Sequence, residues 1–474
     1  MLLLFSFILV PFIFGVLSFF SGSNAKRIAL TGSCISLVLS LCLITQFCEH
    51  PGQELQHSVS WIPAIGASLS LSAGAAAAIL VLLTAIIFPL IFIAQWKRPI
   101  ENPSRFYGLM LLSQAGLMGV FLAHDLLLFY FFWELALIPV YFLCSLWGGE
   151  KRIRVTFKFF IYTFLGSLIM LAAIIWLYIQ TPTRSFDYAT ILQTGQSLSF
   201  GMQQIFFWML FIAFAIKMPL FPFHTWQPDT YEQSATPVTI VLSAIMVKMG
   251  LFAAYKWLLP VLPEGAAYWS QTVMILSVTG IIYASLLAMV QSDLKRIVAY
   301  SSIAHVGLMS LGLFADTPVA TNGFIFQMFN HGINITGMWL IVSMIEDRYK
   351  TRDLKALGGM SGAAPAIAIS LVIMAFASIG LPLTNGFIGE FMLFLGVFQS
   401  ANPNHIAFMV IAGLGIILGA IYTLNMVQKV AYGTAKTTLQ IEKIRPGELF
   451  CLVIIIVIII VLGVYPKLLL GLIG

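Results

Sequence analysis

The chain has 474 residues, of which 60% are hydrophobic and only 9% are charged. Soluble domains carry roughly 25% charged residues, so most of this chain must face lipid rather than water. The composition excludes a secreted disulfide scaffold and an ordinary cytosolic enzyme. A net charge of +6 in such a chain reports the orientation of its loops rather than a nucleic-acid partner.

A bilayer core requires about 20 apolar residues per helix, and fourteen stretches of the chain meet this requirement. We therefore predict an all-α polytopic membrane protein with about fourteen transmembrane helices. In chain order the predicted spans are 2–20, 28–48, 73–95, 106–123, 125–147, 155–179, 203–222, 235–259, 269–290, 297–315, 320–345, 363–398, 405–428 and 448–472.

Two predicted spans are interrupted by proline, which removes a helical hydrogen bond. The seventh contains Lys217-Met-Pro-Leu-Phe-Pro222, and the twelfth, too long for one crossing, contains Ile379-Gly-Leu-Pro-Leu-Thr-Asn-Gly386. We predict broken helices at both places. Because the breaks are five spans apart, spans 4–8 and 9–13 would form two five-helix units of opposite topology, a pattern typical of ion-translocating membrane proteins.

The predicted spans and repeats divide the chain into four parts. Residues 1–99 would form an N-terminal three-helix segment, 100–262 the first five-helix repeat, and 263–430 the second, inverted repeat. Residues 431–474 would form a loop and the last span.

The basic residues predict the orientation of the chain. With this set of spans, 19 of the 24 Lys and Arg residues lie in loops on one side, and only Arg184 and Lys467 lie on the other. Positive loops remain in the cytoplasm. We therefore expect both termini on the outer face of a cell inner membrane, with the mitochondrial inner membrane as an alternative.

Ionisable side chains within spans cost at least about 2.5–3.5 kcal/mol each, so they mark functional positions. Of the 18 acidic residues, all but Glu134 and Glu390 lie at span ends or in loops. Glu134 lies deep in the fifth span, and Glu390 follows the break of the twelfth. Lys217 and Lys248 are similarly deep in the seventh and eighth spans.

Three histidines complete the set of candidates, and each candidate has a simpler interpretation. His305 and His331, in the tenth and eleventh spans, could be structural hydrogen-bond donors, and His224 could belong to a solvated loop. Glu134 could pair with a lysine only to hold helices together. Lys256 lies near the end of its span, where a long side chain normally extends to the interface.

Taken together, a spaced series of buried Glu, Lys and His residues can relay protons. A carboxylate beside Lys217 would keep its ammonium group protonated, and moving that carboxylate away would favour release of the proton. This switch needs no cofactor. The five cysteines show no CxxC or Cys/His spacing, so we expect no metal and no cofactor in this chain.

Several motifs resemble the antiporter-like membrane subunits of respiratory complex I. They are the run 129–143 around Glu134, the run 215–229 around Lys217, the run 293–307 that contains His305, and Asn330-His331-Gly332. Within that family the M-type subgroup is the most similar. Gly386-Phe-Ile-Gly-Glu390 carries Glu where the L and N types carry Lys, and the chain stops after the fourteenth span.

The resemblance implies a role for each candidate residue. Glu134 and Lys217 would serve the inner half-channel, and Lys248 would connect it across the middle. His305 and His331 would lead to Glu390, from which the proton leaves on the outer side. His224 would also lie on the pathway.

The resemblance further implies a subunit of an NADH:quinone oxidoreductase that acts as a translocase. NADH, FMN, iron–sulfur clusters and quinone would bind to partner subunits. The partners would be the L-, N-, K-, A-, J- and H-type membrane subunits, and through them the peripheral arm. Two alternatives remain: a subunit of a Mrp-type cation/proton antiporter or membrane-bound hydrogenase, and a structural spacer with vestigial charges.

Overall fold

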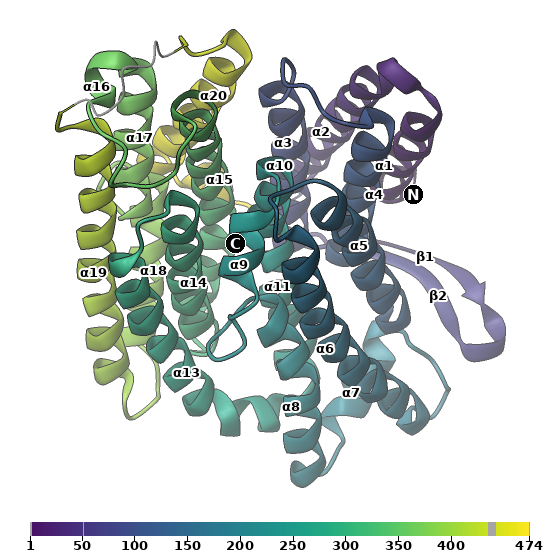
Figure 1. Ribbon diagram of the computed structural model, residues 1–474. Coiled ribbons are helices and arrows are strands. Elements are labelled where there is room, and N and C mark those ends of the chain that lie inside the picture. The colour runs from purple at the N-terminus through teal and green to yellow at the C-terminus, as the bar shows by residue number, and fades with distance from the viewer. Residues whose placement is uncertain (1, 51, 435–441, 474) are drawn as a thin grey trace.

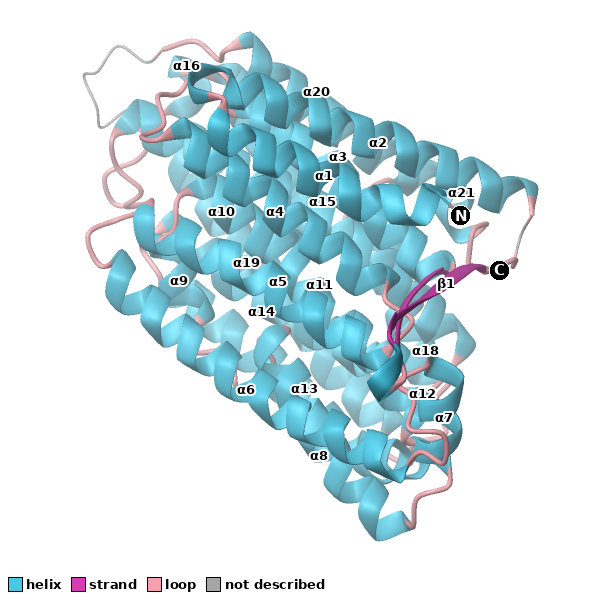
Figure 2. Ribbon diagram, turned by 90° about the vertical axis from the view of Figure 1, so that its right-hand side faces the viewer, coloured by secondary structure: helices cyan, strands magenta, loops and turns pink. Residues whose placement is uncertain are grey.

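The computed structural model describes residues 2–50, 52–434 and 442–473, so the predicted basic position Lys436 lies outside the described residues. The chain forms a bundle of long helices with one projecting β-hairpin (Figures 1 and 2). Within the described residues, 12 helices are long and apolar enough to cross a membrane. The class of polytopic helical membrane protein is therefore confirmed, whereas the count of fourteen spans and the inverted repeats stay predictions.

The helices that correspond to uninterrupted predicted spans each run without a break. They are α1 (Leu2–Phe20), α2 (Ala25–Glu49), α3 (Ala75–Ala94), α4 (Pro103–Leu122), α5 (Leu126–Leu146), α6 (Arg152–Gln180), α13 (Pro263–Val290), α14 (Leu294–Leu313), α15 (Pro318–Tyr349), α19 (His405–Ala431) and α20 (Pro446–Val464). Short helical turns connect some of them: η1 (Gly22–Asn24), η2 (Pro63–Ile65), α7 (Tyr188–Gln196), α16 (Met360–Ala363) and α21 (Lys467–Leu470). The last predicted span, 448–472, is shorter than expected because α20 ends just before Tyr465 and Pro466.

Both predicted breaks are present. Helix α8 (Phe200–Lys217) ends at Lys217, and the chain becomes helical again only in α9 (Gln227–Gln233). The twelfth predicted span consists of α17 (Pro365–Ser378) and α18 (Asn385–Phe398), which flank a non-helical segment at 379–384. In that segment Gly380 has a φ of 68°, a left-handed conformation that suits glycine.

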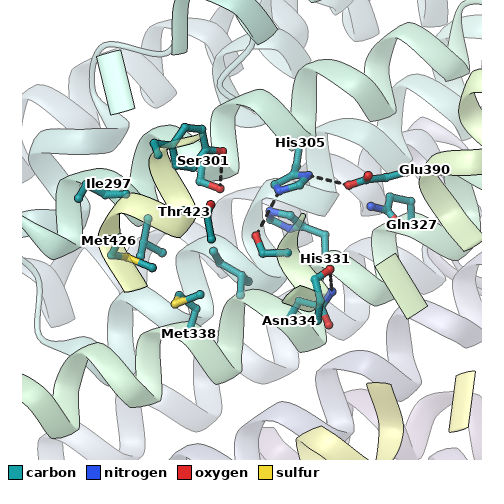
Figure 3. A pocket seen from close by; sticks show the side chains of 15 residues that line it. Ile297, Ser301, His305, Gln327, His331, Asn334, Met338, Glu390, Thr423 and Met426 are labelled. Atoms are coloured by element: carbon teal, nitrogen blue, oxygen red, sulfur yellow. Dashed lines mark hydrogen bonds and ion pairs between the residues drawn. The ribbon is translucent and has the colours of Figure 1, made fainter. Parts of the chain in front are cut away.

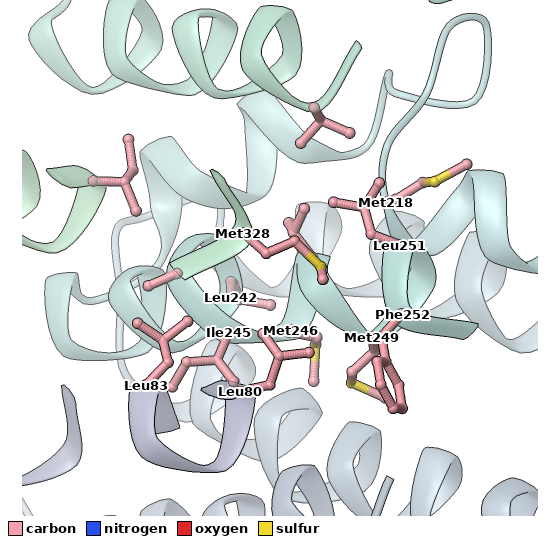
Figure 4. Packing of buried hydrophobic residues seen from close by; sticks show 14 of the residues in the cluster. Leu80, Leu83, Met218, Leu242, Ile245, Met246, Met249, Leu251, Phe252 and Met328 are labelled. Atoms are coloured by element: carbon pink, nitrogen blue, oxygen red, sulfur yellow. The ribbon is translucent and has the colours of Figure 1, made fainter. Parts of the chain in front are cut away.

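The eighth predicted span is continuous but irregular. It comprises α10 (Thr236–Ile240), η3 (Val241–Met246), α11 (Val247–Ala253), η4 (Ala254–Leu258) and α12 (Leu259–Val261), of which η3 and η4 are π-helical. Such wide turns are frequent at functional sites. This span lies in the middle of the bundle, where its apolar residues pack against Leu80 and Leu83 of α3 and Met328 of α15 (Figure 4).

The hairpin was not predicted from the sequence. Strands β1 (Leu55–Ile62) and β2 (Ala67–Ala73) pair in antiparallel register, with Val59 opposite Leu69. The Ser/Leu alternation of 68–72 is the period-two signal of a strand, but it adjoins the apolar run of α3, and no strand was predicted there. The hairpin follows the end of α2 that is opposite Lys26 and Arg27, so it projects from the face opposite these basic residues.

Candidate functional site

Lys217 and Glu134 lie at the break after α8. Lys217 is the last residue of α8, is 1% exposed, and holds its Nζ 5.5 Å from the centre of the Trp133 ring. Among the described residues, neither Lys217 Nζ nor Glu134 Oε1 has a hydrogen-bond partner. Glu134 acts on Lys217 through its charge. The fold thus brings the predicted pair together without a direct ion pair, an arrangement that a small movement or a water molecule can complete.

Lys248 lies at the centre of the molecule and is fully buried. Its Nζ donates a hydrogen bond to the Ser243 carbonyl oxygen at 3.0 Å and lies 2.7 Å from His331 Nδ1. The π-helical turn η3 contains Ser243, and the wider turn leaves a carbonyl free to accept from the lysine. The local irregularity of the eighth span therefore provides an acceptor for a buried ammonium group.

Lys248 and Lys217 belong to helices that approach closely. A Cβ atom on Gly250 would lie 2.6 Å from the Phe214 carbonyl oxygen and 2.8 Å from the Met218 nitrogen, so only glycine permits this approach. The end of α8 therefore packs directly against α11. This places the break that follows Lys217 beside the segment that carries Lys248.

From Lys248 a series of contacts continues into the second half of the chain. The His331 and His305 rings lie 5.6 Å apart between their centres, and His331 Nε2 lies 3.3 Å from Ser302 Oγ. His305 Nδ1 lies 3.5 Å from Glu390 Oε1, while its Nε2 lies 3.5 Å from Ser378 Oγ. Four of the predicted residues thus form one buried series: Lys248, His331, His305 and Glu390.

Small cavities accompany this series (Figure 3). One of about 30 Å³ is lined by His305, His331 and Glu390, and a second of about 40 Å³ by His305, Glu390 and Tyr422. A water molecule needs at least roughly 10–15 Å³ of such space together with polar partners. Both conditions are met, so water can bridge the gaps that the side chains leave.

Glu390 depends on the break in the twelfth span for its position. A Cβ atom on Gly380 would lie 2.5 Å from Glu390 Oε2, so the missing side chain makes room for the carboxylate. Asn330 Nδ2 donates to the Asn385 carbonyl oxygen at 2.8 Å, which ties α15 to the first turn of α18. The broken helix thus places Glu390, which is 7% exposed, at the end of the buried series.

His224 lies apart from this series, in the segment between α8 and α9. It is 4% exposed, and its ring lies 5.7 Å from Phe221 and 5.4 Å from Tyr283 between ring centres. Burial lowers the pKa of His224, and the positive charge of Lys158 lowers it further. The solvated-loop interpretation is wrong, because the ring is enclosed by aromatic side chains.

Several polar residues of the series were missed because serine and tyrosine are common in membrane helices. Ser302 and Ser378 contact His331 and His305 through their hydroxyl groups, whereas Ser243 accepts from Lys248 through its backbone carbonyl oxygen. A signal was available in α15, where Gln327, Asn330, His331 and Asn334 recur at helical spacing on one face.

Charged residues at the ends of spans also form ion pairs that the sequence did not predict. Arg348 Nη2 and Glu448 Oε2 form an ion pair at 2.7 Å, with both side chains 1% exposed, and Arg98 contacts the same carboxylate at 3.3 Å. Near the break after α8, Asp229 pairs with Lys158 at 2.9 Å and Arg296 pairs with Glu232 at 2.7 Å. These pairs join the ends of distant helices on the face that carries the basic loops.

Comparison with known proteins gives a consistent result. The family model described as "NADH:quinone oxidoreductase/Mrp antiporter, TM" matches residues 123–426. NADH-quinone oxidoreductase subunit M of Rhodobacter capsulatus is 38% identical over 464 residues, which is 95% of this chain and 89% of the relative. F420H2 dehydrogenase subunit M of Methanosarcina mazei is 35% identical over 473 residues, covering 97% of this chain and 94% of the relative.

The fold also matches a solved structure. A chain of respiratory complex I from Thermus thermophilus with bound NADH superposes with a TM-score of 0.90 at 27% sequence identity. The match covers 99% of this chain and 98% of that chain.

Proposed function

The chain belongs to the NADH:quinone oxidoreductase/Mrp antiporter family of membrane proteins, and from that premise we propose that it carries protons across the membrane. It is an antiporter-like, multi-pass subunit of the complex I type. The proposed proton-carrying residues are Glu134, Lys217, Lys248, His331, His305 and Glu390.

The observation that carries the proposal is the buried series from Lys248 to Glu390. Charged groups at membrane depth are costly and are retained where they move or bind ions. The His331 and His305 rings lie 5.6 Å apart between their centres. The other neighbouring groups of the series have atoms within 3.5 Å of each other, and small cavities adjoin them. Such spacing supports transfer of a proton from group to group, directly or through water.

The first half of the pathway works as an electrostatic switch. When the Glu134 carboxylate is near, it stabilises the ammonium form of Lys217. When the carboxylate moves away, the buried ammonium loses its only described counter-charge and passes its proton to Lys248. Neither Lys217 Nζ nor Glu134 Oε1 has a hydrogen-bond partner among the described residues, which is consistent with a switch, because a permanent structural pair would be satisfied by hydrogen bonds.

The second half delivers the proton to the outer side. Lys248 and His331 hold one proton between them, and His305 passes it to Glu390, which releases it on the face opposite the basic loops. The redox groups that drive this cycle, NADH, FMN, iron–sulfur clusters and quinone, would sit in partner subunits. We place the chain in a cell inner membrane with both termini outside.

The identity of the partner subunits distinguishes this function from the alternative, a Mrp-type cation/proton antiporter subunit of the same fold. A tagged chain is purified from membranes in mild detergent, and the co-purified proteins are identified. Flavoprotein and iron–sulfur subunits are expected, together with quinone reduction that is coupled to proton uptake in vesicles. Recovery of membrane subunits only, with sodium-dependent proton exchange, would instead support a Mrp-type cation/proton antiporter.

A further inference from the structure

A cavity of about 460 Å³ lies at the base of the hairpin, away from the series described above. Its wall comes from segments that are distant in sequence: Glu54 just before β1, His124 between α4 and α5, Tyr188 of α7 and Lys256 of η4. Residues 472–473 also line it, and Figure 2 shows that end of the chain beside β1. The cavity therefore opens on the face opposite the basic loops.

The ionisable side chains of this cavity influence one another. His124 stacks on Tyr188 at 4.7 Å between ring centres, and its Nδ1 is buried without a hydrogen-bond partner among the described residues. Burial and the Lys256 ammonium lower the pKa of His124, while Glu54 and Asp187 raise it. One carboxylate, one imidazole and one ammonium group thus share a space large enough for several water molecules.

Lys256 lies at the edge of this cavity, and contacts of its backbone and its side chain fix its position. The Lys256 carbonyl oxygen, in the π-helical turn η4, accepts a hydrogen bond from Tyr188 Oη at 3.3 Å. The Lys256 side chain is half-buried, and its Nζ lies 5.7 Å from the centre of the Phe252 ring. A lysine that only extends to the interface would point away from the bundle, whereas this one lies over a buried aromatic ring.

The position of Phe252 relates the cavity to the buried series. Lys248, Phe252 and Lys256 follow one another at intervals of four residues, so they lie along one side of the same helix. Phe252 is 2% exposed and contacts Phe121 at 5.5 Å between ring centres. Figure 4 shows Phe252 beside Met249, within the apolar cluster that surrounds the middle of this span. An apolar constriction of this kind excludes water and closes a pathway until it moves.

We propose that Lys256, together with Glu54 and His124, forms a proton-release site of the first five-helix unit, and that Phe252 closes it from Lys248. This inference rests on the proposed function, because it assumes that Lys248 carries protons. It adds an outlet on the hairpin side that is separate from Glu390. When Phe252 moves, a proton on Lys248 passes to the neutral amine of Lys256, and Glu54 and His124 pass it to outer water.

The test uses the assembled complex, purified and reconstituted into vesicles, with protons translocated per NADH oxidised as the readout. Lys256→Met and Lys256→Arg are compared, because arginine keeps the positive charge but does not release its proton. The proposal predicts that both variants lower the ratio, since removal of a proton-transfer group slows the step by on the order of 10²-fold. Lys467→Met is the matched control, a lysine exposed on the same predicted face.

Two results would overturn the proposal. If Lys256→Arg pumps like the unchanged complex while Lys256→Met does not, the lysine serves as a fixed charge, as it would for an interfacial or anion-binding residue. If both variants match Lys467→Met, the cavity is not an outlet. In either case a loss of pumping in Lys217→Ala shows that the proposed function still stands, so the two failures are distinguishable.

A second variant tests the closure. Phe252→Ala removes the ring that separates the two lysines, and the proposal predicts a faster passive proton leak through the resting complex in vesicles. Adding Lys256→Met to Phe252→Ala should reduce that leak. A leak that is unchanged in Phe252→Ala, with normal content of complex, would contradict a gate at this position.

Discussion

Lys248 Nζ and His331 Nδ1 lie 2.7 Å apart in the interior of the protein, and both side chains are nearly inaccessible to solvent. Two positive charges at this distance would repel strongly, so the pair carries at most one positive charge. With His331 neutral and its proton on Nε2, Nδ1 accepts a hydrogen bond from the lysine and Nε2 donates to Ser302 Oγ at 3.3 Å. A hydrogen bond between two bases allows a proton to pass in either direction.

This relationship predicts a specific mutational result. Lys248→Met preserves much of the side-chain volume but removes the proton carrier, and we expect proton transfer through this point to slow by on the order of 10²-fold. The measurement is the proton-to-NADH ratio of reconstituted complex. Met246→Leu, two residues earlier in the same span, is the matched control and should pump normally. A normal ratio in Lys248→Met would place the pathway elsewhere.

The position of Glu390 can be tested through the glycine that makes room for it. Gly380→Ala would introduce a side chain at a φ of 68° and 2.5 Å from Glu390 Oε2. The left-handed conformation alone costs about 1–2 kcal/mol with a side chain, and the carboxylate must also move. We expect reduced pumping by this variant in a complex that still assembles.

Gly413→Ala is the control for that experiment. It adds the same methyl group to α19 at a position with open space around it. The two variants should differ clearly in the proton-to-NADH ratio. Equal ratios would mean that the placement of Glu390 against the break has no role in proton transfer.

The buried ion pair between Arg348 and Glu448 predicts an effect on stability rather than on proton transfer. Removing one partner from a buried pair costs about 3–5 kcal/mol, and without Arg348 the Glu448 carboxylate keeps the longer ion pair with Arg98 at 3.3 Å. Arg348→Met should therefore lower the thermal unfolding temperature of the purified complex. The exposed pair of Arg445 and Glu442 is the comparison, because such pairs contribute about 0–1 kcal/mol. If Arg445→Ala is equally destabilising, the argument from burial is wrong.

Most of the fold could be predicted because lipid imposes a simple rule. A span must be long and apolar, and a proline-rich interruption must break it, so the ends of α8, α17 and α18 were close to their predicted places. The hairpin β1–β2 was missed because five residues of Ser/Leu alternation beside α3 are a weak signal. The π-helical turns η3 and η4 leave no trace in hydropathy, so they could not be predicted either.

The residues of the candidate site could be predicted from the sequence, but the contacts between them could not. Charge at membrane depth identified Lys217, Lys248 and Glu390, since the cost of burial makes such residues rare. Sequence offered no means of knowing that Lys248 contacts His331 while Lys217 and Glu134 form no direct ion pair, because those distances depend on helix packing. Charges in the first turn of a span, such as Glu448, were assigned to the interface, although the Glu448 side chain is buried and pairs with Arg348 and Arg98.

The central claim is that buried ionisable residues carry protons through this chain, and Lys217→Ala tests it most directly. The variant and the unchanged complex are purified, matched for content, and reconstituted, and proton translocation driven by NADH is measured in vesicles. The account predicts a strong loss of translocation in Lys217→Ala, with Lys467→Ala unaffected. Translocation at the unchanged rate in Lys217→Ala would contradict it and would leave the chain as a structural element of the membrane arm.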